Sequence, residues 1–159
     1  MKIRRATREE APLIAELILE LALFEKAPES AQASLADISE AFFCDHPAVF
    51  CNFIEDEAGL VQGFAIWFLN YSTWTGTHGI YLEDLFIRAQ ARGKGYGKAM
   101  LRHLAALCVE RGYHRLQWWV LDWNTNAIEF YQGFGAQLMD EWTTMRVEGV
   151  ALTRLSVER

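Results

Sequence analysis

Two neighbouring carboxylates, Glu83 and Asp84, interrupt an otherwise apolar and aromatic stretch that runs from Tyr81 to Ile87. Apolar surroundings disfavour the charged form of a carboxyl group and raise its pKa towards the range useful for proton transfer near neutral pH. We expect the stretch to be a strand, in which adjacent side chains point to opposite faces. One acid would then face a substrate, unless a bulge redirects the other. The alternative is that one or both acids pair with a nearby Arg or Lys.

A glycine-rich turn follows this stretch and reads Arg92-Gly93-Lys94-Gly95-Tyr96-Gly97-Lys98. It opens a helical pattern that runs to Glu110. Backbone N–H groups at a helix start attract anions, and glycine lets a ligand approach the backbone closely. The basic side chains of the turn add positive charge. The turn therefore predicts a pyrophosphate site, and the alternative is a loop that only turns the chain.

Two common nucleotide-binding motifs do not fit this turn. A P-loop requires Ser or Thr after Gly-Lys, whereas here Ala99 follows Gly97 and Lys98. A Rossmann fingerprint requires G-x-G-x-x-G early in its fold, whereas this chain has G-x-G-x-G after several expected antiparallel strands. The remaining pattern is R-x-x-G-x-G, formed by Arg92, Gly95 and Gly97.

The histidines and cysteines predict neither a metal site nor a hydrolase. The four histidines show no metal-ligand spacing, and the chain has no G-x-S-x-G elbow. Cys44, Cys51 and Cys108 form no C-x-x-C pair. Reduced thiols in a cytoplasmic protein are the simplest interpretation.

Composition limits the class of protein and of partner. The chain has 159 residues, of which 52% are hydrophobic, and this predicts one domain over residues 1–159. The net charge of -6, without a basic run, disfavours nucleic acid and favours a small cationic substrate. No apolar stretch approaches the ~20 residues of a membrane helix, and the first residues do not resemble a signal peptide. We therefore expect no membrane partner.

The apolar periodicities predict an α/β fold with a mixed sheet. Thr7 and Glu10 have capping-box spacing at the start of the first helix, and Gly112 is the expected cap of the helix that follows the glycine turn. That helix connects two strands, which should therefore be parallel, whereas the earlier strands should be antiparallel. The expected strands are Lys2–Ala6, Val49–Glu55, Val61–Leu69, Tyr81–Ile87, Leu116–Leu121 and Thr143–Val147, and the later helices are Gly97–Glu110, Ala127–Gln132 and Val150–Leu155.

Several segments together resemble the GNAT superfamily, the acetyl-CoA-dependent N-acetyltransferases. The R-x-x-G-x-G turn is similar to a motif of that family, and the element order is similar to the GNAT fold along nearly the whole chain. A more specific likeness is to the spermidine/spermine (diamine) N-acetyltransferases and to their thialysine-acetylating branch. It rests on Tyr81-Leu82-Glu83-Asp84, the Arg92–Gly97 turn, Val120-Leu121-Asp122-Trp123-Asn124, and Phe130-Tyr131 followed by Gly135-Ala136. The resemblance implies a homodimer that uses acetyl-CoA and no metal.

The resemblance also implies which residues carry the reaction. Glu83 would act as the base that takes a proton from the amine, through a water molecule. Tyr131 would act as the acid, because its phenol can donate a proton to the departing sulfur. From the residues alone, Tyr131 is better explained as an amphipathic core tyrosine on an apolar helix.

Cofactor contacts follow from the same resemblance. The backbone of the strand would bind the pantetheine arm as an added strand does, the glycine turn would bind the pyrophosphate, and Asn124 would contact the pantetheine from the other side. The last strand pair is expected to splay and admit the cofactor. The implied cofactor-binding residues are Leu85, Phe86, Ile87, Arg92, Gly93, Lys94, Gly95, Tyr96, Gly97, Lys98, Asn124 and Tyr131.

The amine is expected to contact Glu25, Trp74, Glu83 and Asp84, because carboxylates pair with an ammonium and an aromatic face attracts it. Alternatively, Glu25 is a solvated charge at a helix end and Trp74 anchors a loop. The chain has Ser72 where the diamine enzymes carry an acid, which disfavours long polyamines.

The predicted function is transfer of the acetyl group of acetyl-CoA to a primary amine of a small molecule, by direct attack in a ternary complex. The favoured acceptors are diamines, polyamines or lysine-like amino acids. The alternatives are a protein or antibiotic amine as acceptor, or a non-catalytic acyl-CoA-binding module. The presence of both Glu83 and Tyr131 disfavours the module.

Overall fold

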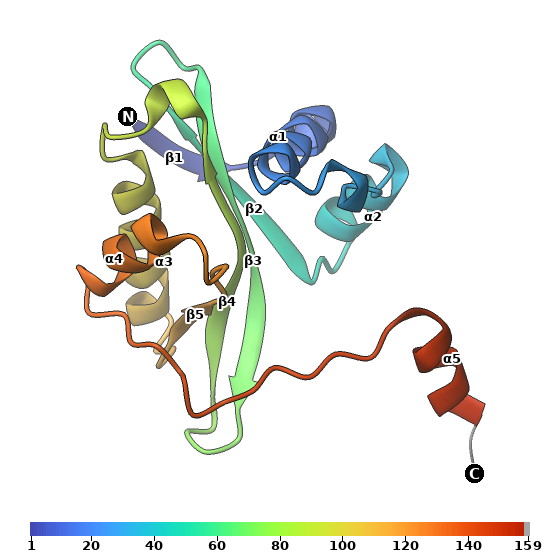
Figure 1. Ribbon diagram of the computed structural model, residues 1–159. Coiled ribbons are helices and arrows are strands. Elements are labelled where there is room, and N and C mark those ends of the chain that lie inside the picture. Colours follow the sequence, from blue (N-terminus) through green and yellow to red (C-terminus); the bar gives the residue numbers. More distant parts are fainter. Residues whose placement is uncertain (158–159) are drawn as a thin grey trace. The chain divides into compact units, whose positions relative to one another are not determined.

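The computed structural model describes residues 1–157. The chain divides into two compact units, Met1–Trp119 and a second unit that begins at Val120 (Figure 1). One domain over residues 1–159 remains a prediction.

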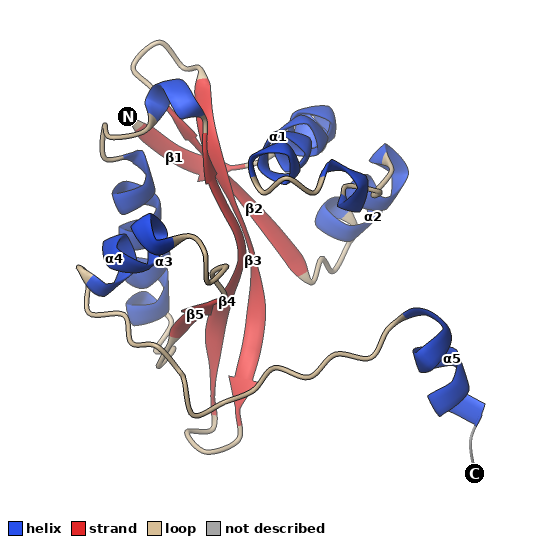
Figure 2. Ribbon diagram, in the orientation of Figure 1, coloured by secondary structure: helices blue, strands red, loops and turns tan. Residues whose placement is uncertain are grey.

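The first unit is built on a five-stranded sheet with the order β1-β2-β3-β4-β5 (Figure 2). The first four strands are antiparallel neighbours, and β5 pairs with β4 in parallel. This arrangement confirms the predicted mixed sheet. The strands are β1 (Lys2–Arg5), β2 (Val49–Glu55), β3 (Val61–Ser72), β4 (Thr77–Ile87) and β5 (Leu116–Trp118).

Helices cover both faces of this sheet. In Figure 2, α1 (Ala11–Phe24) and α2 (Leu35–Phe43) lie on one face, and α3 (Tyr96–Glu110) lies on the other. Side chains of α1 and α2 form the main core with inward-facing residues of the strands. Three short 3-10 turns complete the unit, at Arg8–Glu10, Pro28–Ser30 and Ala89–Ala91.

Local sequence signals explain where the helices begin and end. The Thr7 N–H donates to the Glu10 carboxylate at 2.9 Å, as the capping-box spacing predicts. The Asp37 N–H donates to the Ser34 hydroxyl at 3.2 Å and starts α2. Gly112, with a φ of 67°, takes the left-handed conformation that follows α3.

The hairpin of β3 and β4 is longer than predicted. Its ladder continues through Asn70↔Gly79 to Ser72↔Thr77, where the sequence suggested a loop. The rings of Tyr71 and His78 meet edge to face across this extension, with centroids 5.3 Å apart. Such cross-strand pairs stabilise a hairpin that polar residues would otherwise weaken.

The second unit contains α4 (Thr125–Gln132) and α5 (Gly149–Val157). Asn124 caps α4, because its side-chain oxygen accepts from the Ala127 N–H at 3.3 Å. Both helices were predicted, but α4 begins two residues earlier than the predicted Ala127, and α5 extends beyond the predicted Val150–Leu155 at both ends.

Two strand predictions near the carboxyl end were wrong. The strand expected over Leu116–Leu121 ends at Trp118, where its pairing with β4 stops at Leu82. Thr143–Val147 forms no strand, and its five residues are exposed. Alternating side chains suit a strand, but a strand also needs a partner for its backbone hydrogen bonds, and within the described chain this segment has none.

Candidate active site

A bulge in β4 positions the two candidate acids. Trp67 pairs with Leu82 and Ile66 pairs with Asp84, so Glu83 is an extra residue in the ladder. Without the bulge, Leu82 and Asp84 would share one face of the sheet. With it, Asp84 lies opposite Ile66, which belongs to the core beneath α1 and α2. The bulge therefore turns Asp84 towards α1, while Glu83 is exposed.

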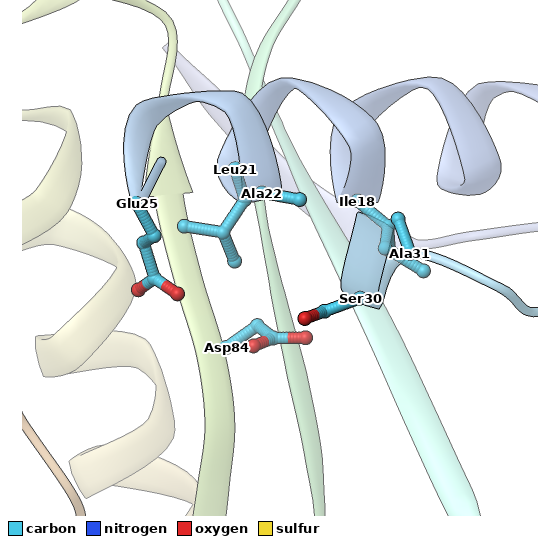
Figure 3. A pocket seen from close by; sticks show the side chains of 7 residues that line it. All are labelled: Ile18, Leu21, Ala22, Glu25, Ser30, Ala31 and Asp84. Atoms are coloured by element: carbon cyan, nitrogen blue, oxygen red, sulfur yellow. The ribbon is translucent and has the colours of Figure 1, made fainter. Parts of the chain in front are cut away.

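Asp84 lies in a small open pocket between α1, the following 3-10 turn and β4. Its volume is about 130 Å³, the room of about four water molecules. Figure 3 shows the Asp84 carboxyl, the Glu25 carboxyl and the Ser30 hydroxyl pointing into it. The lining residues are Ile18, Leu21, Ala22, Glu25, Ser30, Ala31 and Asp84.

The pocket is acidic. Burial raises the pKa of Asp84 to about 7, and the nearby charges of Glu83 and Glu25 add to this effect. Burial also raises the pKa of Glu25, although its side chain remains largely exposed. Within residues 1–157, no Lys, Arg or His forms an ion pair with either carboxyl. The pocket therefore attracts a cation, and its desolvated acid is Asp84, whereas desolvation was predicted at Glu83.

The structure does not bring Trp74 to this pocket. Trp74 lies in the turn between β3 and β4, and 93% of its surface is exposed. Asp84 lies seven positions along β4 from Thr77, which at about 3.3 Å per residue is roughly 23 Å. Within one chain, Trp74 therefore contacts no ligand that is held by Asp84 and Glu25.

The glycine turn fits the phosphate group that the sequence predicts. Gly93 and Gly95 have φ values of 75° and 85°, which side-chain-bearing residues rarely adopt. The position of a Cβ at either glycine faces open space, so a ligand can approach the backbone. Helix α3 begins at Tyr96, and the Ala99 N–H bonds back to the Gly95 carbonyl. The N–H groups and the positive dipole end at the start of a helix favour an anion.

Arg92 of this turn is directed towards α1. Its guanidinium lies 4.2 Å from the centroid of the Phe24 ring. Its Nε donates to the Ile87 carbonyl at 3.0 Å. Arg92 therefore holds the turn against the end of α1, whereas the exposed Lys94 and Lys98 side chains supply positive charge at the surface of the turn.

The edge of β4 beyond the bulge is open. On one side, Leu85, Phe86 and Ile87 pair with β3. On the other side, the ladder with β5 ends at Leu82, so in the described part of the sheet this stretch has no second strand partner. An open strand edge can accept an extended ligand by backbone hydrogen bonding, as predicted for the pantetheine arm.

Tyr131 and Asn124 belong to the second unit. Tyr131 is half-buried on α4, next to the ring of Phe130, and burial raises the pKa of its phenol. The phenol therefore keeps its proton at neutral pH and is able to donate it. Asn124 uses its side-chain oxygen to cap α4.

Two residues near the pocket escaped the sequence reasoning, Ser30 and Arg88. Arg88 directly follows β4 and binds the carboxylates of Glu16 and Glu20 on α1, with a distance of 2.8 Å to Glu20. It thereby fixes α1 over the strand that carries Asp84. The i, i+4 spacing of the two glutamates was a local signal, but their distant partner was not readable from the sequence.

The model provides two further observations. Among residues 1–157, no group of three or more His, Cys, Asp or Glu side chains is arranged to hold a metal ion. Over the same residues, no helix is both long enough and apolar enough to cross a membrane.

Comparison with known proteins identifies the family to which this chain belongs. Residues 15–136 match the model of the acetyltransferase (GNAT) family. The chain therefore belongs to this family and is an acetyltransferase. Acetyl-CoA is the acetyl donor that the family generally uses.

Among its relatives is L-ornithine N5-acetyltransferase NATA1 of Arabidopsis thaliana, 34% identical over 95% of this chain and 86% of the relative. Another is thialysine N-epsilon-acetyltransferase of Mus musculus, 32% identical over 98% of this chain and 96% of the relative. A solved structure, an integron cassette protein from the mobile metagenome of V. cholerae, superposes with a TM-score of 0.82 at 27% identity, covering 99% of this chain and 98% of that chain. These relatives confirm the predicted GNAT fold and the likeness to the thialysine branch.

Proposed function

We propose that this acetyltransferase moves the acetyl group of acetyl-CoA to a primary amine of a small molecule. The favoured acceptors carry a second amino group, as diamines, polyamines and lysine-like amino acids do. The observation that carries the proposal is the acidic pocket of Asp84 and Glu25 beside the open edge of β4. Its volume of about 130 Å³ suits one ammonium group and a short aliphatic chain.

In the proposed complex, the pocket binds the ammonium that does not react. Asp84 and Glu25 provide negative charge, and the apolar side of α1 contacts the methylenes of the substrate. The reacting amine then lies near the bulge, where Glu83 is exposed. This assignment separates two roles for the neighbouring acids, with Asp84 positioning the substrate and Glu83 accepting the proton.

The reaction requires a neutral amine, because an alkylammonium with a pKa of ~10.4 has no free lone pair. Glu83 takes the proton through a water molecule. The amine nitrogen bonds to the thioester carbonyl carbon and loses its second proton to solvent, and the bond from that carbon to sulfur breaks. Tyr131 donates its phenol proton to the departing sulfur and recovers a proton from solvent. The phenol is protonated at neutral pH and can therefore donate a proton or a hydrogen bond to the sulfur.

The proposed donor site combines three parts of the chain. The backbone of Leu85, Phe86 and Ile87 binds the pantetheine arm along the open strand edge. The turn from Gly93 to Lys98 binds the pyrophosphate, and Asn124 contributes from the second unit. No metal takes part in this scheme.

The named relatives support a small amine with a second polar end. One acetylates L-ornithine and the other thialysine, by their names. Long polyamines are less favoured, because Ser72, the last residue of β3, stands where the diamine enzymes carry an acid. We further propose a cytoplasmic homodimer, and size-exclusion chromatography with light scattering tests the dimer.

A panel of amines tests the proposed function. Purified protein is mixed with acetyl-CoA and diamines, polyamines, ornithine, lysine or thialysine, and free thiol is followed. We expect release with at least one short diamine or diamino acid, and mass spectrometry should find an N-acetylated product. Acetylation of a protein or an aminoglycoside, with no turnover of any small diamine or diamino acid, would overturn the proposal.

A further inference from the structure

We propose that Ser30 determines specificity by completing a cradle of three acceptors that recognises a primary ammonium and discriminates against N-methylated amines. The inference rests on the proposed function and concerns the ammonium that does not react. Ser30 has no role in the catalytic scheme above.

The three acceptors come from three different elements. Glu25 follows the last residue of α1, Ser30 ends the 3-10 turn, and Asp84 follows the bulge of β4. In Figure 3, the Ser30 hydroxyl and the Asp84 carboxyl point towards each other, and the Glu25 carboxyl lies apart from them at another side of the same pocket. The other lining side chains, from Ile18 to Ala31, are aliphatic. The three polar groups therefore share the pocket with an aliphatic wall.

The number and type of these groups match one chemical form of amine. A primary ammonium has three N–H donors, and each N-methyl group removes one of them. A trimethylammonium has none, and proteins bind it with the faces of aromatic rings. None of the residues lining this pocket is aromatic. The pocket is therefore suited to an unmethylated nitrogen.

Ser30 is held in place by its own turn. Lys26, with a φ of 61°, reverses the chain directly after α1. The Ser30 N–H donates to the Ala27 carbonyl at 3.0 Å, and the Gln32 N–H donates to the Ser30 carbonyl at 3.0 Å. Pro28 begins the turn and restricts its backbone. The hydroxyl is thus presented from a fixed backbone, although Ser30 lies at the exposed rim of the pocket.

A serine contributes differently from a third acid. A third carboxylate would add repulsion to Asp84, whose pKa is already raised to about 7. A hydroxyl accepts a hydrogen bond without charge, and its rotation adapts it to a bound or an empty pocket. Loss of the hydroxyl should therefore reduce the preference for a primary ammonium while leaving the attraction of the pocket for cations.

The test compares diamines that differ only at the nitrogen that does not react. The probes are 1,4-diaminobutane and its N-methyl, N,N-dimethyl and N,N,N-trimethyl derivatives, and mass spectrometry confirms acetylation of the unmodified primary amine. For the wild type we expect kcat/KM to fall with each methyl group, by about tenfold for the first. For Ser30→Ala we expect kcat/KM for the unmethylated diamine to fall. The difference in kcat/KM between the unmethylated and the N-methyl diamine should then nearly disappear.

Ser30→Thr is the matched control, because it keeps the hydroxyl and should keep the difference in kcat/KM between the unmethylated and the N-methyl diamine. The KM for acetyl-CoA should be the same in all three proteins. A wild type that acetylates the unmethylated and the N-methyl diamine equally well would overturn the inference. A Ser30→Ala variant that keeps the wild-type difference in kcat/KM between these two diamines would overturn it too. Failure to acetylate any amine would instead overturn the proposed function, so the two failures are distinguishable.

Discussion

The guanidinium of Arg92 lies over the aromatic ring of Phe24, at 4.2 Å from its centroid. Phe24 is the last residue of α1, and Glu25 follows it directly. The contact therefore joins the proposed pyrophosphate turn to the helix end that bears one acid of the amine pocket. A substitution that breaks this contact should therefore affect binding at both the pyrophosphate turn and the amine pocket.

Arg92→Lys should weaken the binding of both substrates, acetyl-CoA and the amine. Lysine keeps the charge but replaces the planar guanidinium that stacks on Phe24 and bonds the Ile87 carbonyl. We expect the Kd of acetyl-CoA and the KM of the amine each to rise by about two- to fivefold. Calorimetry and steady-state rates measure these values. Arg102→Lys, an exposed position on α3, is the control. If Arg92→Lys changes neither the Kd of acetyl-CoA nor the KM of the amine, the contact of Arg92 with Phe24 does not contribute to substrate binding.

The amine should bind better as Asp84 loses its proton. Its pKa of about 7 means that the carboxyl is largely protonated below neutrality and charged above it. We expect kcat/KM for a diamine to rise with pH through about 7, and Asp84→Asn to lower kcat/KM by about tenfold or more and flatten this rise. The profile is measured from pH 5.5 to 9. An unchanged profile in Asp84→Asn would assign the titration to another group.

Glu83→Gln separates the two acids. If Glu83 is the base, the variant should lose turnover, by about 10² to 10⁴-fold, with little change in amine binding. Asp84→Asn should act mainly on amine binding. Single-turnover rates at saturating amine make the distinction, and the same defect in both variants would argue against separate roles.

Tyr131→Phe should lower kcat by about 10²-fold while the Kd of acetyl-CoA stays nearly constant, because only the proton donor is lost. Tyr113→Phe is the matched control; its ring contacts His78 and it has no proposed catalytic role. Turnover that survives in Tyr131→Phe would remove this residue from the acid role.

The desolvated acid should also reduce stability at neutral pH. The folded chain holds a proton on Asp84 up to pH about 7, whereas the ordinary pKa of an aspartate is 3.8. The folded state therefore binds more protons between these values, and stability falls as pH rises through them. Asp84→Asn should be the more stable protein at pH 8, by about 1 kcal/mol after solvent screening, or about 2–4 °C in Tm. Thermal melts at pH 4 and 8 test this, with Asp45→Asn as the exposed control.

The sequence predicted the sheet and its helices because their signals are local. The capping residues Thr7 and Ser34 and the glycine turn at Gly93 and Gly95 each define a helix boundary by chemistry within a few residues. The order of the elements predicted which strands are parallel and which are antiparallel, and the resemblance to a known family added the name of the fold.

The site was only partly predictable because its geometry depends on register. The sequence placed Glu83 and Asp84 side by side but did not show that the ladder skips Glu83, so it assigned desolvation to the wrong acid. Ser30 gave no signal, because its approach to Asp84 depends on how α1 packs over β4. Trp74 was grouped with Glu25 and Asp84 by chemical type, and the length of the hairpin separates them.

The extra residue in β4 can also be separated from the faces that its neighbours occupy. A substitution at Glu83 changes a side chain, but its deletion would restore strict alternation along the strand. Leu82 and Asp84 would then be adjacent and on opposite faces, so Asp84 would still face α1 and Phe86 would stay in the core that it shares with Phe64. Deletion of Glu83 should therefore remove the proposed base and the local bend of β4 without moving Asp84 to the other face of the sheet.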